Sequence, residues 1–404
     1  MGELKITRLG SQGDGVAETP DGRFYLPYTL PGDVVWDGAP EDLKILRHSG
    51  HRSNPTCAHF QQCGGCTLQH ANDIFLADWK RDEVKRALND LADGVDFRPT
   101  LTSPPQSRRR AKLSGRRTKK GTVVGFYARN SDNLISVPDC KILHPDILAG
   151  FAALHELTKI GATRKNSIAF MVTRSAAGLD VDVRDAKPGD QTILTRLAAL
   201  SSAHDLARLS WNGETVSTRA PPLQHFGKTP VVPPIGAFLQ ATEHGQDALI
   251  HAVLKVLGPA KKVLDLFAGC GTFSLPIAER AKIEAVESDS AMLAALNTAW
   301  RGGAGLLPLT PQVRDLFRRP LLHDELAQFD AAVIDPPRAG ARAQIAEISD
   351  SDLPRLAYVS CNPQTFARDT RSLINGGYRL DWIQTIDQFR WSAHVELVAQ
   401  FVRP

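Results

Sequence analysis

The C-terminal part of the chain contains the segment KKVLDLFAGCGT at residues 261–272. Its apolar residues predict a short buried strand over 261–267, and its two glycines predict a tight turn. Residues 273–278, FSLPIA, then begin a helix. A strand, a glycine turn and a helix in this order let the backbone approach a bound ligand closely. The segment therefore predicts an α/β domain with a ligand beyond the end of its first strand.

A second strand, predicted over 283–287, ends in the carboxylate of Glu287. A carboxylate at this place in such a unit typically binds the hydroxyl groups of a ribose. The glycine turn lacks the three-glycine spacing that brings backbone N–H groups to a pyrophosphate. We therefore expect an adenosyl ligand without phosphates, and a nicotinamide oxidoreductase is the least favoured enzyme class.

Two further apolar runs predict strands over 331–334 and 356–359, followed by Asp335 and Cys361. Strands that alternate with helices favour a doubly wound parallel sheet. Because ligands gather at the carboxyl edge of such a sheet, we expect Asp335 and Cys361 to lie near the glycine turn.

Cys361 is followed by Asn362 and Pro363, a favourable N-cap and a favourable first helical residue. We therefore expect Cys361 to lie against the N-terminus of a helix. The helix dipole and its free N–H groups would favour the thiolate, which is the reactive form of cysteine. A buried core cysteine is the alternative reading of this residue.

The composition is that of an ordinary globular protein of 404 residues, which suggests two or three domains. No apolar run is long enough to span a membrane and no signal-peptide pattern is present, so we expect a cytoplasmic protein without a membrane partner. The formal net charge is only +4, but basic residues are concentrated between 108 and 120. That run predicts a hairpin with a cationic face suited to a phosphate backbone.

Three segments are expected. Residues 1–50 carry short strand-like pieces between turn signals, which predicts an OB-like β-barrel. Residues 51–235 predict a central α+β domain, and the proline-rich stretch 230–234 closes it. Residues 236–404 hold the doubly wound sheet.

Three cysteines are grouped as Cys57, Cys63 and Cys66, and Cys140 is the remaining cysteine before the C-terminal domain. In a cytoplasmic chain this spacing indicates a metal or cluster site rather than disulfides. Gly64-Gly65 lets the backbone fold tightly between two of the thiols. Four thiolates suit either a tetrahedral Zn²⁺ ion or a [4Fe–4S] cluster.

The motifs together resemble the RNA 5-methyluridine methyltransferases. They are VLDLFAGCGTFSLP at 263–276, DPPRAG at 335–340 and YVSCNPQTFARD at 358–369. The early cysteines are similar to the iron–sulfur motif of the 23S ribosomal RNA branch, and residues 3–45 resemble its N-terminal barrel, the TRAM domain. The resemblance implies a Rossmann-like class I methyltransferase domain, S-adenosylmethionine as cofactor and a [4Fe–4S] cluster on the four cysteines.

The resemblance also implies residue roles. Cys361 would be the nucleophile that adds to carbon 6 of uracil, and Glu396 the base that later removes the proton from carbon 5. S-adenosylmethionine would contact Gln240, Phe267, Thr272, Glu287, Asp315 and Asp335. Thr272 stands where relatives often have Asn, and Arg390-Trp391-Ser392 stand where relatives often have Pro-His-Thr. We expect the second departure to alter contacts to the target base.

The function expected from the resemblance is methylation of uracil C5 in 23S ribosomal RNA by a monomeric enzyme. The alternatives are the same reaction on tRNA, methylation of an amino group on adenine or guanine, and a non-catalytic iron–sulfur RNA-binding protein. Amino-group methylation would not need Cys361, and a non-catalytic protein would not bind S-adenosylmethionine.

Overall fold

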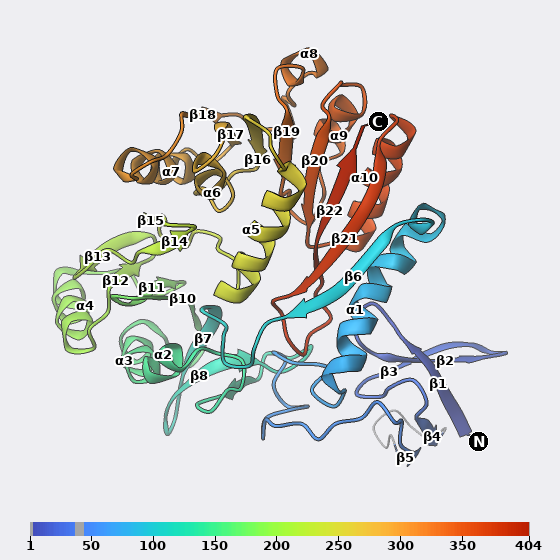
Figure 1. Cartoon of the computed structure of the whole chain (residues 1–404). Coiled ribbons are helices and arrows are strands. Elements are labelled where there is room, and N and C mark those ends of the chain that lie inside the picture. The colour runs from blue at the N-terminus through green and yellow to red at the C-terminus, as the bar shows by residue number, and fades with distance from the viewer. Residues whose placement is uncertain (1–2, 37–43, 404) are drawn as a thin grey trace.

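The computed structural model describes residues 3–36 and 44–403. The N-terminal part is an antiparallel sheet of five strands in the order β3-β2-β1-β4-β5 (Figure 1). Its strands are β1 Glu3–Leu9, β2 Gly15–Thr19, β3 Gly22–Leu26, β4 Val34–Trp36 and β5 Ile45–Arg47. The sheet has a small core of its own, made by Ile6, Ala17 and Val35, so the expected short strands of the N-terminal part are confirmed as an antiparallel sheet.

The central part is built on a sheet of seven strands in the order β13-β12-β11-β10-β7-β8-β9. The strands are β7 Arg110–Thr118, β8 Gly121–Tyr127, β9 Leu134–Ser136, β10 Ile168–Ser175, β11 Gly178–Arg184, β12 Arg208–Trp211 and β13 Glu214–Thr218. Helices α2 Pro145–Ala149, α3 Phe151–Gly161 and α4 Gln191–Ala203 pack against it. A short hairpin follows, formed by β14 Gln224–Phe226 and β15 Thr229–Val231.

The C-terminal part is a mixed sheet of eight strands in the order β18-β17-β16-β19-β20-β22-β21-β6. Its strands are β16 Lys262–Leu266, β17 Lys282–Glu287, β18 Leu309–Val313, β19 Ala331–Ile334, β20 Arg355–Ser360, β21 Arg379–Asp387, β22 Glu396–Val402 and β6 Asp96–Thr102. The five strands from β18 to β20 are parallel, whereas β22 is antiparallel to both of its neighbours. The chain leaves β16 in one direction towards β17 and returns to its other side at β19, which is the doubly wound topology expected.

Helices cover both faces of this sheet. Neighbouring residues of a strand face opposite sides, so Val263 and Leu264 of β16 belong to two different cores. The first core includes α5 Glu243–Leu257, α6 Ser274–Ala278 and α7 Ser290–Gly302. The second includes α1 Asp73–Leu88, α8 His323–Leu326, α9 Arg342–Ser349 and α10 Pro363–Asn375.

Two elements from the early sequence complete the C-terminal sheet. Strand β6 pairs in parallel with β21, with Trp382 opposite Asp96 and Asp387 opposite Thr102, and the two lie side by side in Figure 1. Helix α1 packs against β6 and α10. One strand of the C-terminal sheet, β6, and one helix that covers it, α1, therefore come from a part of the chain that precedes the seven-stranded sheet.

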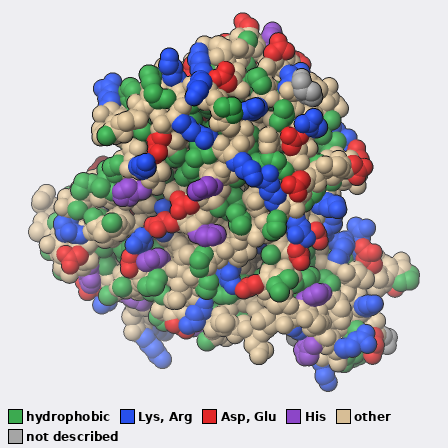
Figure 2. All heavy atoms as spheres, viewed as in Figure 1, with side chains coloured by type: hydrophobic (Ala, Val, Ile, Leu, Met, Phe, Trp, Pro, Cys, Tyr) green, Lys and Arg blue, Asp and Glu red, His purple; other side chains and the backbone are tan. Residues whose placement is uncertain are grey.

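Among the described helices, none combines the length and the apolar character that crossing a membrane requires. On the face shown in Figure 2, Lys and Arg side chains are interspersed with Asp and Glu.

Candidate functional site

A large cavity lies at the carboxyl edge of the eight-stranded sheet, next to the switch point between β16 and β19. Its volume is about 1670 Å³, including the part open to solvent. All eight residues expected at a donor and catalytic site line this C-terminal cavity: Gln240, Phe267, Thr272, Glu287, Asp315, Asp335, Cys361 and Glu396. Phe238, Phe317 and Arg338 also line it, although the sequence analysis did not identify them.

The glycine turn after β16 holds a strained backbone. Phe267 has a φ of +64° and Gly271 a φ of +100°, both in the left-handed region. A Cβ atom at Gly271 would lie 2.4 Å from Cδ1 of Leu296, so only glycine fits there. The N–H of Gly269 donates to Oε2 of Glu287 at 3.1 Å. The acid that ends β17 thus holds the turn as well as lining the cavity.

The antiparallel strand β22 brings Glu396 to Cys361. Ser360 at the end of β20 pairs with Leu397, so the next residue on each strand, Cys361 and Glu396, reaches the same edge of the sheet. Glu396 is buried and Cys361 is half-buried. A nucleophile and a carboxyl group that lie 35 residues apart in sequence numbering, at 361 and 396, are therefore neighbours in the fold.

Three carboxyl groups are crowded at this edge. Burial, with a contribution from the nearby Asp265, raises the pKa of Asp335 to about 7. Burial, with a contribution from Asp335, raises the pKa of Glu396 to about 8. Burial also raises the pKa of Asp265 to about 7, against a hydrogen bond from Ser274. The crowding favours a positively charged ligand, because a cation would stabilise the ionised carboxylates.

The Cys361 thiol differs from the sequence-based expectation. Asn362 does cap α10, accepting a hydrogen bond from the N–H of Gln364 at 3.1 Å. Burial, followed by repulsion from Glu396 and Asp335, raises the pKa of Cys361 to about 11. Burial and the two acids thus oppose the thiolate that was expected at this helix N-terminus, whereas Arg338 and the backbone N–H of Cys361 favour it.

Cys361 also lines a second cavity, where the three large sheets meet. This junction cavity has a volume of about 1380 Å³. It is lined by Ser11 and Gln12 of the N-terminal part, by Gly64, Gly65 and Thr67, and by Arg108, Arg338, Phe389, Ser392 and His394. Cys361 therefore separates two cavities, and two ligands could approach it from different sides.

Of residues 390–392, which depart from the family pattern, only one lines the junction cavity. Arg390 forms an ion pair with Asp73 of α1 and donates to the carbonyl oxygen of Ser103 at 3.2 Å. Trp391 is buried, and its carbonyl oxygen accepts from the N–H groups of Thr67 and Leu68 at 3.0 Å each. Of the three residues, only Ser392 lines the junction cavity. The expected effect on base contacts is thus confined to Ser392, because the other two join α1 and residues 67–68.

A buried glutamine that the sequence analysis missed connects the cavity residues. Nε2 of Gln388 donates to Oε1 of Gln240 at 2.5 Å, and Oε1 of Gln388 accepts from the N–H of Ala241 at 2.7 Å. Gln388 directly follows β21, in the connection that leads to Glu396. Its place close before the His394-Val395-Glu396 motif is the signal that could have identified it.

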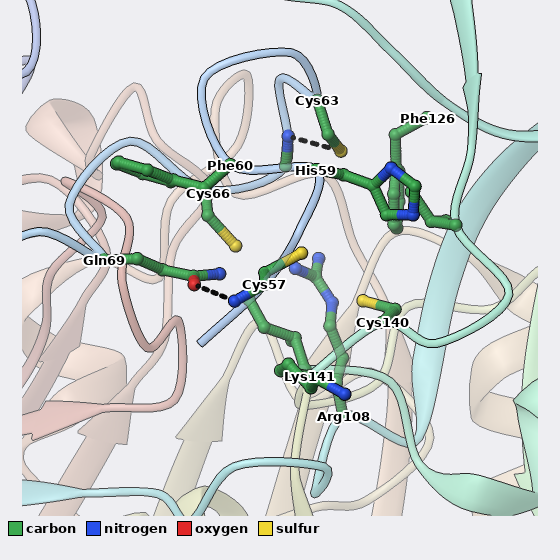
Figure 3. A pocket seen from close by; sticks show the side chains of 13 residues that line it. Cys57, His59, Phe60, Cys63, Cys66, Gln69, Arg108, Phe126, Cys140 and Lys141 are labelled. Atoms are coloured by element: carbon green, nitrogen blue, oxygen red, sulfur yellow. Dashed lines mark hydrogen bonds between the residues drawn. The ribbon is translucent and has the colours of Figure 1, made fainter. Parts of the chain in front are cut away.

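The four early cysteines line one cavity, which we call the cysteine cavity. Figure 3 shows the sulfur atoms of Cys57, Cys63, Cys66 and Cys140 facing a shared space. Burial, with smaller contributions from the three neighbouring thiols, raises the pKa of Cys66 to about 12. Among the described residues, no group of three or more His, Cys, Asp or Glu has the arrangement of a single metal-ion site. Four cysteine sulfur atoms around one space are suited to a cationic group that takes four thiolate ligands, since such a group would remove their mutual repulsion.

Gly64 is required where the cysteine loop meets the central sheet. Its N–H donates to the carbonyl oxygen of Tyr127 in β8 at 2.9 Å. A Cβ atom at Gly64 would lie 2.7 Å from that same oxygen. The tight backbone expected of Gly64-Gly65 is confirmed, and it docks the loop on β8.

The basic run 108–120 forms the expected hairpin of β7 and β8, and only part of it is exposed. Arg109 is buried, donating to the carbonyl oxygen of Gln240 at 3.2 Å and to Oε1 of Gln246 at 2.7 Å. Arg108 lies between the cysteine cavity and the junction cavity. The exposed members are Lys112, Arg117, Lys119 and Lys120. Only these four residues of the run are exposed enough to form the cationic face that the sequence predicts, because the first arginines join the parts of the molecule.

Comparisons with known proteins show to which family this chain is similar. The family model described as tRNA (uracil-5-)-methyltransferase matches residues 309–402. A protein of Brucella melitensis described as an uncharacterized RNA methyltransferase is 42% identical over 98% of this chain and 97% of its own length. The 23S rRNA (uracil(1939)-C(5))-methyltransferase RlmD of Chromohalobacter salexigens is 33% identical over 99% of this chain and 89% of its own.

A solved structure shares the fold. The tRNA (uracil-54, C5)-methyltransferase of Pyrococcus abyssi, in complex with S-adenosyl-L-homocysteine, has a TM-score of 0.78 to this chain. The match covers 99% of both chains at 22% sequence identity. The whole architecture, including the N-terminal sheet and the central part, is thus known from another protein.

Proposed function

This chain belongs to the RNA uracil-C5 methyltransferase family, and we propose that its substrate is a uridine of 23S ribosomal RNA. The enzyme transfers a methyl group from S-adenosylmethionine to carbon 5 of uracil. The observation that carries the proposal is the position of Cys361 beside Glu396, between the C-terminal cavity and the junction cavity. The 33% identity to a 23S ribosomal RNA enzyme across nearly the full chain supports the choice of RNA.

Cys361 is proposed as the nucleophile. Carbon 5 of uracil is a poor nucleophile until a thiolate adds to carbon 6, which forms a C–S bond and an enolate. Carbon 5 of the enolate then takes the methyl group that S-adenosylmethionine supplies on its sulfonium. Cys361 must lose its proton first, and a positive charge bound in the C-terminal cavity would favour that step against the repulsion from Glu396 and Asp335.

Glu396 is proposed as the base that ends the reaction. After methyl transfer, carbon 5 carries both the methyl group and its original proton. Removal of that proton by the Glu396 carboxylate restores the ring double bond and breaks the C–S bond to Cys361. A pKa of about 8 suits a group that must accept a proton near neutral pH.

The donor contacts proposed from the family are six residues of the C-terminal cavity. Glu287 suits the ribose hydroxyl groups, and Phe267 and Thr272 lie in and after the glycine turn. Asp335 suits the sulfonium, because its buried carboxyl group lies near Asp265 and Glu396. Gln240 lies before α5 and Asp315 follows β18, where its carboxylate accepts from the N–H of Phe317 at 3.0 Å.

The cysteine cavity is proposed to hold a [4Fe–4S] cluster on Cys57, Cys63, Cys66 and Cys140. The cluster would support RNA recognition or folding, because the cysteine loop also lines the junction cavity through Gly64 and Gly65. Stoichiometric zinc without acid-labile sulfide, in protein purified under anaerobic conditions, would overturn this assignment.

We further propose that the chain is divided into segments 1–50, 51–235 and 236–404. The last segment would bind the methyl donor, and the first two would bind RNA.

The test is mass mapping of RNA from cells that lack the protein, rescued with the wild type or with Cys361→Ala. We expect one 5-methyluridine of 23S RNA to disappear in the deletion strain and to return only with the wild type. Unchanged 23S RNA together with a missing 5-methyluridine in tRNA would move the substrate to tRNA. That alternative is favoured by the description of the matching family model and by the activity of the Pyrococcus abyssi protein.

A further inference from the structure

We propose that Gln388 is a positioning residue that links the donor-binding amide of Gln240 to the carboxyl group of Glu396. The inference rests on the proposed function and deepens it, because it adds a residue that no motif of the chain assigned. Gln388, Gln240 and Glu396 are all buried. Gln388 and Glu396 flank the connection between β21 and β22, whereas Gln240 precedes α5, so the contact between Gln388 and Gln240 is a property of the fold.

The orientation of both amides follows from one backbone group. The N–H of Ala241 can only donate, so the group it contacts at 2.7 Å must be the oxygen of Gln388. The nitrogen Nε2 of Gln388 then faces Gln240 at 2.5 Å, and Gln240 must present its oxygen to it. The NH₂ group of Gln240 is therefore the part left for a ligand in the C-terminal cavity. A donor at that place suits the carboxylate of the amino-acid part of S-adenosylmethionine.

Strand pairing also brings Gln388 to Glu396, because Ile386 of β21 lies opposite Glu396 of β22 and Gln388 follows two residues after Ile386. Gln388 donates to the Glu396 carboxyl group, which opposes the larger effects of burial and Asp335 on its pKa. The other titratable groups near Glu396 are Asp335, after β19, and the Cys361 thiol, after β20, and Arg338 lies near that thiol. Gln388 is thus the neutral donor among acids, and it favours the ionised form of Glu396 that accepts the proton.

Gln388 is itself held in place. The neighbouring Asp387 forms a buried ion pair with Lys80 of α1 at 2.6 Å, and its Oδ1 accepts from the N–H of Phe389 at 3.0 Å. A Cβ atom at Gly245 would lie 2.7 Å from Cβ of Gln388, so the side chain has little room to move. Such support is what a positioning residue needs to keep two ligand-facing groups in register.

The experiment compares Gln388→Leu and Gln388→Glu with the wild type and with Gln344→Leu. Gln344 is an equally buried glutamine, bonded to the N–H and carbonyl of Leu321 away from both cavities, so its variant controls for lost stability. Affinity for S-adenosylhomocysteine is measured by calorimetry without RNA. The pH dependence of product release is measured in single turnover on ribosomal RNA.

We expect both Gln388 variants to bind S-adenosylhomocysteine roughly tenfold more weakly, as when a buried polar group loses its partner. We also expect the half-maximal rate of product release to move to higher pH, because Glu396 loses a donor to its charged form. Gln344→Leu should change neither quantity. Should Gln388→Leu fail to fold, the nearly isosteric Gln388→Glu carries the test alone.

Wild-type affinity and an unmoved pH profile in a folded Gln388 variant would overturn the inference while leaving the proposed function intact. Absence of 5-methyluridine in the wild-type reaction would instead reject the function, and calorimetry would still report on Gln388.

Discussion

The C-terminal cavity and the cysteine cavity both gather groups that repel one another in their ionised forms. In the first, Asp335 and Glu396 line the cavity at the ends of strands, and Asp265 of β16 is buried close to Asp335. In the second, four thiols are held by loops and share one space. The sheet keeps the carboxyl groups in place, in their neutral form, even without a ligand. The loops that carry the thiols are supported by fewer contacts. The difference suggests that the first cavity is built for a cation that comes and goes, and the second for one that stays.

Replacing one sulfur in each cavity gives the largest expected contrast. Cys66→Ser should lower the melting temperature by about 10 °C or more, because metal binding at such a site contributes directly to folding. Cys361→Ser should leave the melting temperature unchanged yet reduce methylation by at least about a thousandfold. Calorimetric unfolding and single-turnover assays check both. An unaltered melting temperature for Cys66→Ser would mean that the cysteine cavity needs no resident group.

Replacing one of the acids that line the C-terminal cavity should stabilise the folded protein. Glu396 keeps its proton in the folded protein up to a pH of about 8, whereas in the unfolded chain it ionises near its ordinary pKa. The wild type therefore loses stability as pH rises through that interval. Glu396→Gln should raise the free energy of unfolding at pH 8.5 by roughly 4 to 5 kcal/mol, with no gain at pH 4. Urea unfolding at the two pH values is the measurement, and an equal gain at both would contradict the electrostatic cause.

The charge of the ligand should set how its binding depends on pH. At pH 6 the carboxyl groups of Asp335 and Glu396 are largely neutral, and at pH 8.5 they are ionised. The affinity for S-adenosylmethionine, which carries a sulfonium, should rise about tenfold over this range relative to the neutral S-adenosylhomocysteine. Calorimetry with both ligands measures the ratio, and a constant ratio would count against a cation site.

The smallest expected effect concerns the basic hairpin outside both cavities. Lys119→Glu with Lys120→Glu alters two exposed residues, and should weaken RNA binding a few-fold and reduce its salt dependence. The matched control is Lys261→Glu with Lys282→Glu, which makes the same change of charge. These two residues lie at the start of strands β16 and β17, at the end of the strands that faces away from the C-terminal cavity. Filter binding at several salt concentrations tests both pairs, and equal slopes would remove the hairpin from the RNA surface.

The C-terminal site could be predicted because its residues follow strands that the sequence marks locally. Asp335 and Cys361 each directly follow a strand, and the carboxyl edge of a parallel sheet brings such positions together. Gln388 could not be found in this way, since its partners Gln240 and Ala241 are contacts of the tertiary structure. The charge state of Cys361 was missed for a related reason. A helix N-terminus is visible in the sequence, whereas the burial and the acids that oppose it are not.

The edge strand β6 has a consequence for how the chain is made. Residues 96–102 leave the ribosome early, but their partner β21 begins at Arg379, close to the end of the chain. The eight-stranded sheet therefore cannot be completed until synthesis is almost finished, and β6 and α1 must stay available until then. A fragment spanning 236–404 would leave β21 as an unpaired edge, open to pairing with other chains. Expression of the methyl-transferring part alone should accordingly give aggregates, and adding residues 73–102 in front of it should restore soluble protein.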